Sequence, residues 1–100
     1  MNTLEKLELL NANCSDRSEL DRILGQLLNV MLTRHRQKLA IYDADISKFE
    51  RVHQLDSILF QKQFESGQLG DEMDFFEWFS LCELRKDLLV KVSKLEQALR

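Results

Sequence analysis

The stretch Leu20-Asp-Arg-Ile-Leu-Gly-Gln-Leu-Leu-Asn-Val-Met-Leu32 places apolar side chains at steps of three and four residues. This spacing gathers them on one side of an α-helix, because a helix turns once every ~3.6 residues. The same steps continue beyond the stretch to Leu39, Tyr42, Ile46 and Phe49. The pattern therefore predicts one long amphipathic helix.

Little in the sequence would end this helix early. The chain has no proline, and no glycine lies between Gly25 and Gly67. Asp16, three residues before Glu19, forms a variant of the capping box at the expected start. A helix from about residue 16 to about residue 53 would be roughly 57 Å long, whereas a compact chain of this size has a radius of gyration of only ~13 Å. We expect a second copy or another protein to cover its apolar face.

Shorter helices are expected on either side of the long one. Thr3 would cap a helix that reaches about Ala12. Asp56 or Ser57 would cap another helix, which would end at Gly67 because glycine readily adopts the left-handed conformation after a helix.

The last helix is expected to begin at Asp74, with Glu77 completing a second variant capping box. Arg85 occupies one seam position of its heptad, and the remaining a and d positions are apolar: Leu81, Leu88, Val92, Leu95 and Leu99. The sequence thus predicts an all-α fold, a long-helix antiparallel hairpin with short accessory helices, assembling as a helical bundle of two or more copies. Residues 1–15 would form a short helix and turn, and residues 16–100 the hairpin domain.

Composition and charge narrow the function classes. Fourteen Lys and Arg residues against seventeen Asp and Glu give a net charge of −3, so no overall basic field attracts nucleic acid or a membrane surface. No apolar run approaches the ~18–20 residues of a membrane span, and the first residues do not follow the pattern of a signal peptide. Two cysteines are too few for a disulfide framework or a zinc site. We expect a cytoplasmic protein without a cofactor.

The sequence offers little support for catalysis or nucleic-acid binding. It contains no glycine-rich phosphate loop, nucleophile elbow or His-Glu-x-x-His pattern, so we expect no enzyme and no catalytic or metal site. The basic patch Arg34–Lys38 could contact phosphates, but it spans little more than one turn and has no interleaved aromatic residue. A solvated helix face, or a patch that complements the acidic loop of a second subunit, is the favoured interpretation.

The stretch Phe64–Trp78 combines acids, aromatic residues and two glycines, with no basic residue. The acids suit the start of a helix, where the macrodipole favours negative charge. The aromatic side chains of Phe75, Phe76, Trp78 and Phe79 point around nearly three-quarters of a helix, so one apolar stripe cannot bury them all. The preceding short helix, a sister subunit or a foreign protein would have to cover them. Aromatic residues beside charges are also typical of interface hot spots.

Several features from about residue 42 onwards form an ordered pattern: Phe49-Glu50, then Phe60 and Phe64, then Gly67-Gln-Leu-Gly-Asp71, then Asp74-Phe-Phe-Glu-Trp78. In this order they resemble the antitoxin member of TumE–TumA-type toxin–antitoxin pairs and its uncharacterised relatives. The chain departs from that pattern at the joint after the long helix, where Val52-His53 replaces Tyr-Gly. Histidine would then have to adopt a positive φ, or the joint would be straighter. Residues 1–15 lie outside the resemblance.

The resemblance implies a non-catalytic protein that neutralises a small toxin by binding it with the hairpin end. Asp71, Glu72 and Asp74 would steer a basic partner, and the aromatic anchors would be Phe75, Phe76, Trp78 and Phe79. The alternative is a purely structural homo-oligomer whose aromatic residues all serve its own core. A third interpretation is a nucleic-acid accessory protein that uses the basic patch.

Overall fold

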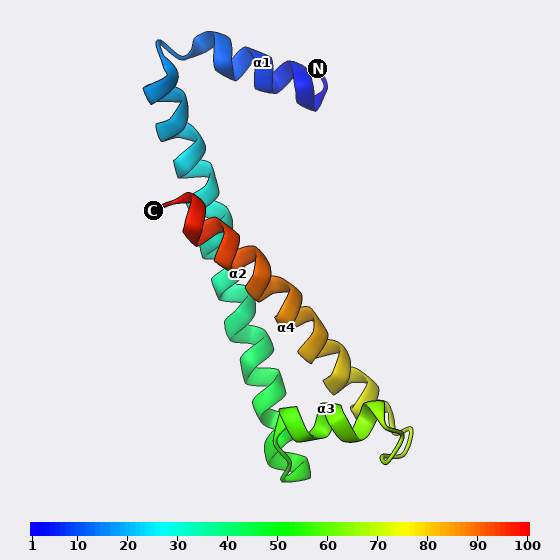
Figure 1. Cartoon of the computed structure of the whole chain (residues 1–100). Helices are drawn as coiled ribbons and strands as arrows, with labels where there is room; N and C mark the ends of the chain where they lie inside the picture. Colours follow the sequence, from blue (N-terminus) through cyan, green and yellow to red (C-terminus); the bar gives the residue numbers. More distant parts are fainter.

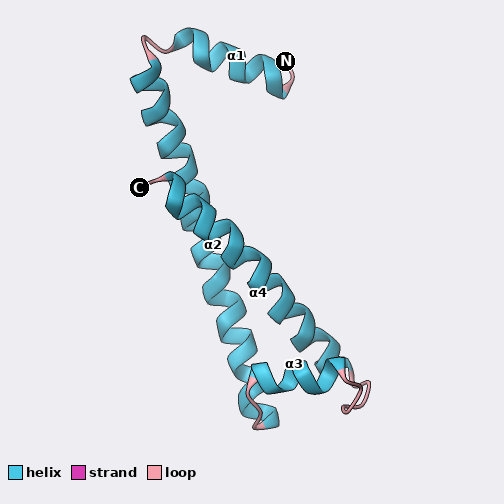
Figure 2. Cartoon of the chain, in the orientation of Figure 1, coloured by secondary structure: helices cyan, strands magenta, loops and turns pink.

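The computed structural model describes residues 1–100 and contains four helices and no strand (Figures 1 and 2). The helices are α1 (Thr3–Asn13), α2 (Arg17–His53), α3 (Ser57–Glu65) and α4 (Met73–Ala98). They account for 83% of the chain, which confirms the all-α fold class.

Helices α2 and α4 form a long antiparallel hairpin, and α3 crosses its wide end (Figure 1). The molecule measures 60 × 27 × 19 Å and has a radius of gyration of 19.7 Å, well above the ~13 Å of a compact chain of this length. Helix α4 is the shorter arm of the hairpin: a Cβ atom added to Gly25 would lie 4.0 Å from Leu99 Cδ2, near the end of the chain. The first turns of α2, and α1 with them, therefore extend beyond α4.

The start of α2 follows the sequence prediction. Asp16 Oδ1 accepts a hydrogen bond from the backbone N–H of Glu19 at 2.8 Å. The returning contact of a capping box is displaced by one residue, because the Glu19 carboxylate accepts from the backbone N–H of Ser15 at 3.0 Å and also from the Ser15 hydroxyl. These bonds hold the pKa of Glu19 below its usual value of 4.5.

Two predicted caps are corrected by one or two positions. Helix α1 is capped by Asn2 and not by Thr3, since Asn2 and Glu5 form a reciprocal capping box with bonds of 2.8 and 3.4 Å. Helix α4 begins at Met73 with Glu72 as its N-cap, and the Glu72 side chain makes no capping bond. Asp74 lies inside the first turn, where its carboxylate faces a histidine of α2.

The joint after α2 contains a left-handed residue, but at a different position from the one expected. His53 is the last helical residue, and Gln54 adopts φ +50°. Asp56 then caps α3 by accepting from the backbone N–H groups of Ile58 and Leu59. Helix α3 ends just before Gly67, whose φ of +77° is the left-handed conformation that glycine was expected to supply.

The core lies where the three hairpin elements meet. Ile46 of α2, Phe60 of α3, and Trp78 and Cys82 of α4 form its buried cluster. Farther along the hairpin, α2 and α4 contact each other along one line of apolar side chains, the seam, in which Leu32, Leu88 and Val92 are buried. The polar seam position, Arg85, donates a hydrogen bond to Asp43 of α2 and so keeps its charge partnered.

Most of the chain surrounds this core without being buried in it. Only seven of the 100 residues are buried, and the accessible surface is 7594 Å². A compact protein of this mass exposes about 5,900 Å², so the chain exposes roughly 1,700 Å² more than its mass requires. None of the helices is both long enough and apolar enough to cross a membrane.

Candidate protein-interaction surface

Trp78 forms the centre of the hairpin end and is completely buried, with 0% of its surface exposed. Its indole ring stacks on Phe60 of α3 at a centroid distance of 3.7 Å and an interplanar angle of 3°. The ring also stacks against Phe49 and His53 of α2, at 5.9 and 5.7 Å. The indole N–H donates to Ser57 Oγ at 3.0 Å. In this structure Trp78 is a core residue that joins three helices, and no surface of it is open to a partner.

The three phenylalanines around Trp78 divide between core and surface. Phe75 is half-buried and packs against His53 at a centroid distance of 5.2 Å. Phe79 is half-buried as well, and it stacks on Phe64 of α3 at 4.8 Å. Phe76 meets the same Phe64 edge-on at 5.4 Å, but it remains 49% exposed. Of the four expected anchors, Phe76 is thus the one with a large face open to solvent.

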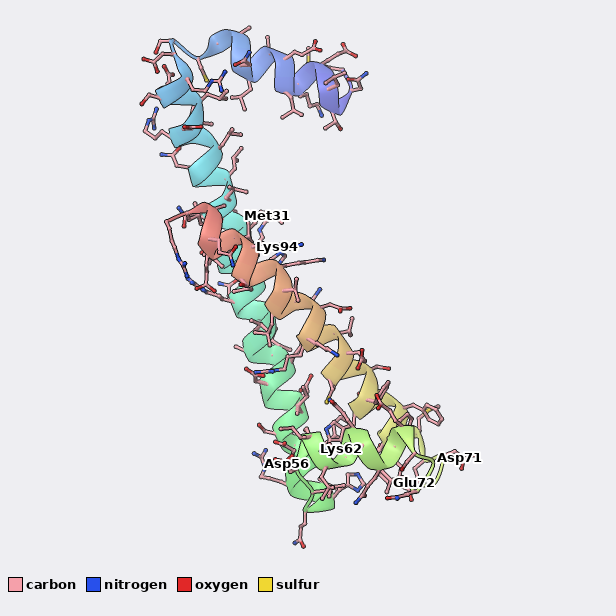
Figure 3. All side chains as sticks on the ribbon, in the orientation of Figure 1. Met31, Asp56, Lys62, Asp71, Glu72 and Lys94 are labelled. Carbon is pink, nitrogen blue, oxygen red and sulfur yellow. The ribbon has the colours of Figure 1, made fainter.

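The three expected acidic residues lie in two different settings. Asp71 and Glu72 are exposed in the loop between α3 and α4, where Figure 3 shows them at the outer edge of the hairpin end. The carboxylate of Asp74 lies 3.7 Å from His53 Nε2, a nitrogen that is itself buried and has no hydrogen-bond partner. Asp71 and Glu72 are therefore free to meet a partner, whereas Asp74 also contacts the chain's own core.

Exposed apolar and acidic side chains lie together along one edge of the hairpin end. We call this edge the hairpin-end surface; it consists of Asp71, Glu72, Met73 and Phe76. Met73 and Phe76 are both exposed, and they stand three residues apart on α4, so their side chains lie on the same face. Glu72 precedes Phe76 by four residues and borders that face. This arrangement suits an apolar anchor on a partner protein, surrounded by basic residues.

Some contributors to this end of the molecule were not identified from the sequence. Met73 was not considered, because the last helix was expected to begin at Asp74, although the spacing of Met73 from Phe76 could have indicated a shared face. Ser57 was considered only as a cap, yet its hydroxyl accepts from Trp78 and its backbone N–H donates to Glu50 Oε2 at 3.0 Å. Nothing in the sequence indicates these two bonds, because both depend on how α3 crosses the hairpin.

The basic patch on α2 is partly engaged within the chain. Arg36 lies 3.7 Å from the Glu96 carboxylate of α4. The Lys38 ammonium lies over the ring of Tyr42 at 5.9 Å from its centroid. Arg34 makes no ion pair. Of the patch's three Lys and Arg side chains, Arg36 is thus the one in an ion pair, and that pair is exposed to solvent.

A groove of about 440 Å³ lies between α2, α3 and α4, on the side of the hairpin that carries Asp43 and Arg85. These two residues pair with each other, and Glu50 in the same groove accepts from the backbone of Ser57. Most of the charge in the groove is therefore satisfied internally, and the hairpin-end surface is the stronger candidate for binding.

Comparisons of the chain with protein-family models, with curated proteins and with solved structures found no match.

Proposed function

We propose that the chain is a non-catalytic protein-interaction module that binds another protein through its hairpin-end surface. The observation that carries this proposal is the exposure of Phe76 and Met73 beside Asp71 and Glu72, at the end of the hairpin. Because Phe60 stacks on Trp78 and Phe64 contacts Phe76, Phe76 is held in place before a partner arrives. Such preorganisation lowers the entropic cost of binding.

The proposed partner is a small basic toxin, and the chain would act as its cytoplasmic antitoxin. The resemblance to TumA-type antitoxins supports this choice, as does the acidic edge of the surface. The residues of the resemblance have distinct roles in this proposal. Gly67 and Trp78 shape the hairpin end, and Phe76 makes the direct contact, with Asp71 and Glu72 guiding the approach of the toxin.

Affinity capture from the native host tests the proposal when wild type is compared with two variants. Phe76→Ala removes an anchor that is 49% exposed, and Leu84→Ala removes an α4 side chain that is 48% exposed and lies two helical turns away. Wild type and Leu84→Ala should retain one small basic protein in stoichiometric amount, at low and at moderate salt. Phe76→Ala should lose most of it, because an aromatic anchor that is fully desolvated in a complex often carries much of the binding energy.

Binding alone does not show that the captured protein is a toxin, so the growth of the host is measured as a second readout. Expression of the captured protein alone should arrest the host, and co-expression with wild type or Leu84→Ala should restore growth. Co-expression with Phe76→Ala should restore it poorly. Recovery of only untagged copies of the chain would contradict the proposal and favour the purely structural homo-oligomer.

A further inference from the structure

The end of the molecule opposite the hairpin loop carries apolar surface that nothing in the chain covers. Helix α1 has no buried residue: Leu4, Leu7 and Leu9 are exposed, and Leu10 is only partly buried. Helix α1 projects away from the hairpin and makes no extensive contact with another helix (Figure 1). We call it the arm. An isolated helix of 11 residues is marginal in water, since about 12–15 residues are needed even for good helix formers. A stable α1 requires something to pack against.

The neighbouring part of α2 presents a matching surface. From Ile23 to Thr33 the helix contains no charged residue. One side of this segment packs toward α4 through Gly25 and Leu32. A second stripe lies on another side of the helix, at steps of three and four residues, and most of it is exposed: Leu20, Leu24, Leu27 and Met31. Figure 3 shows Met31 on α2 near the end of α4.

We propose that two copies of the chain associate by exchanging these surfaces, so that α1 of each copy packs on the second stripe of the other. Each chain carries both halves of the contact, as a two-fold interface requires. The lengths agree as well, because α1 and the segment from Leu20 to Met31 each extend about 16 Å. The self-association is independent of toxin binding, because the arm lies far from the hairpin-end surface (Figure 1).

The exposed area and the charges both favour a second copy of the chain as the partner of α1 and the second stripe. A stable interface buries about 800 Å² per partner, and the chain exposes roughly 1,700 Å² more than a compact protein of its mass. Helix α1 has a net negative charge from Glu5, Lys6 and Glu8. Beyond Met31 the second stripe continues with Arg34, which has no ion-pair partner in its own chain. Acids of one copy can therefore meet a free cation of the other.

The linker between α1 and α2 explains why α1 does not cover its own α2. Cys14 and Asp16 are both extended, with ψ values of 139° and 178°. The bonds from Ser15 to the Glu19 carboxylate hold this linker against the start of α2. With this extended, hydrogen-bonded linker, α1 projects from the start of α2 instead of lying along it (Figure 1).

Sedimentation equilibrium tests the self-association with matched variants. Leu7→Glu and Leu27→Glu each place a charge in the proposed contact, and Val90→Glu places one on α4; the three residues are 53%, 54% and 53% exposed. Wild type and Val90→Glu should form dimers with equal Kd, whereas Leu7→Glu and Leu27→Glu should each bind at least ~30-fold more weakly, since a buried charge without a partner is costly. The proposal would be overturned if Leu7→Glu and Leu27→Glu had the same dimer Kd as wild type, or if wild type were a monomer at all concentrations.

Disulfide trapping identifies which helices meet. In chains with Cys14→Ser, a Leu7→Cys copy and a differently tagged Leu27→Cys copy should form a mixed disulfide under mild oxidation. The buried Cys82 can stay in place. A single chain that carries both cysteines tests the alternative in which α1 folds back on its own α2. An intramolecular disulfide in dilute solution, or the failure of the mixed disulfide to form, would overturn the exchange of arms.

Discussion

At the scale of single residues, the main result is the separation of roles within Phe75–Phe79. The sequence shows four aromatic side chains that cannot share one stripe, and it leaves three possible covers for them. The structure identifies α3 as the cover for most of them: Phe60 stacks on Trp78, and Phe64 contacts Phe76 and Phe79. A residue that resembles an interface hot spot in the sequence can thus be one of the most buried side chains in the fold.

This separation predicts stability losses of very different size for two substitutions. Trp78→Ala should lower the free energy of unfolding by about 3–5 kcal/mol, because it leaves a large cavity among three helices and an unused hydroxyl at Ser57. Phe76→Ala should lower it by less than about 1 kcal/mol, since half of that side chain is already in water. Urea denaturation followed by circular dichroism measures both values. Similar losses in the two variants would contradict the assignment of Trp78 to the core.

Glu19 gives a second residue-scale prediction. Its pKa is lowered mainly by the hydrogen bond from the Ser15 side chain and then by the bond from the Ser15 backbone. A lowered pKa in the folded state means that this contact stabilises the fold above the usual value of 4.5 and is lost as the pH falls through the folded-state pKa. Ser15→Ala should raise the Glu19 pKa toward its usual value in a carboxyl NMR titration, and Ser80→Ala should not. An unchanged Glu19 pKa in Ser15→Ala would show that the hydroxyl has no part in the shift.

At the scale of helices, the glycines have different roles that substitution should reveal. Gly25 lies within α2, and a Cβ atom there would meet Leu99 at an ordinary contact distance of 4.0 Å. Gly25→Ala should therefore stabilise the chain by about 0.5–1 kcal/mol, because alanine favours the helix. Gly67 has φ +77°, so Gly67→Ala should destabilise it by about 1–2 kcal/mol. Thermal melting compares the two, and a destabilised Gly25→Ala would mean that the end of α4 packs more tightly than the structure indicates.

Helix boundaries were largely predictable from the sequence because they depend on local chemistry. Asp16 begins α2 as expected, and Asp56, one of the two expected caps, begins α3, since each supplies a carboxylate to nearby backbone N–H groups. The prediction was wrong at Thr3, where the neighbouring Asn2 makes the better reciprocal box, and at Asp74, which turns toward His53 instead of capping. The burial of Trp78 was not predictable, because it depends on how α3 crosses the hairpin, and no local spacing encodes that crossing.

At the scale of the whole molecule, the chain exposes more surface than a self-sufficient domain of its mass. Its core occupies the hairpin end, and a single seam extends from it, while α1 and the start of α2 have no cover. The two ends differ in chemistry: an acidic and aromatic end, which we propose binds a foreign protein, and an apolar arm, which we propose binds a second copy. If the arms associate but no partner binds the hairpin end, the structural homo-oligomer is the correct interpretation.

The most direct test of the central claim is a calorimetric titration of the captured partner into purified wild type, Phe76→Ala and Leu84→Ala. We expect wild type and Leu84→Ala to bind with equal affinity, and Phe76→Ala to bind at least ~10-fold more weakly, because only that variant loses an anchor at the interface. Equal affinities for all three chains would contradict the proposal that the hairpin-end surface binds the partner.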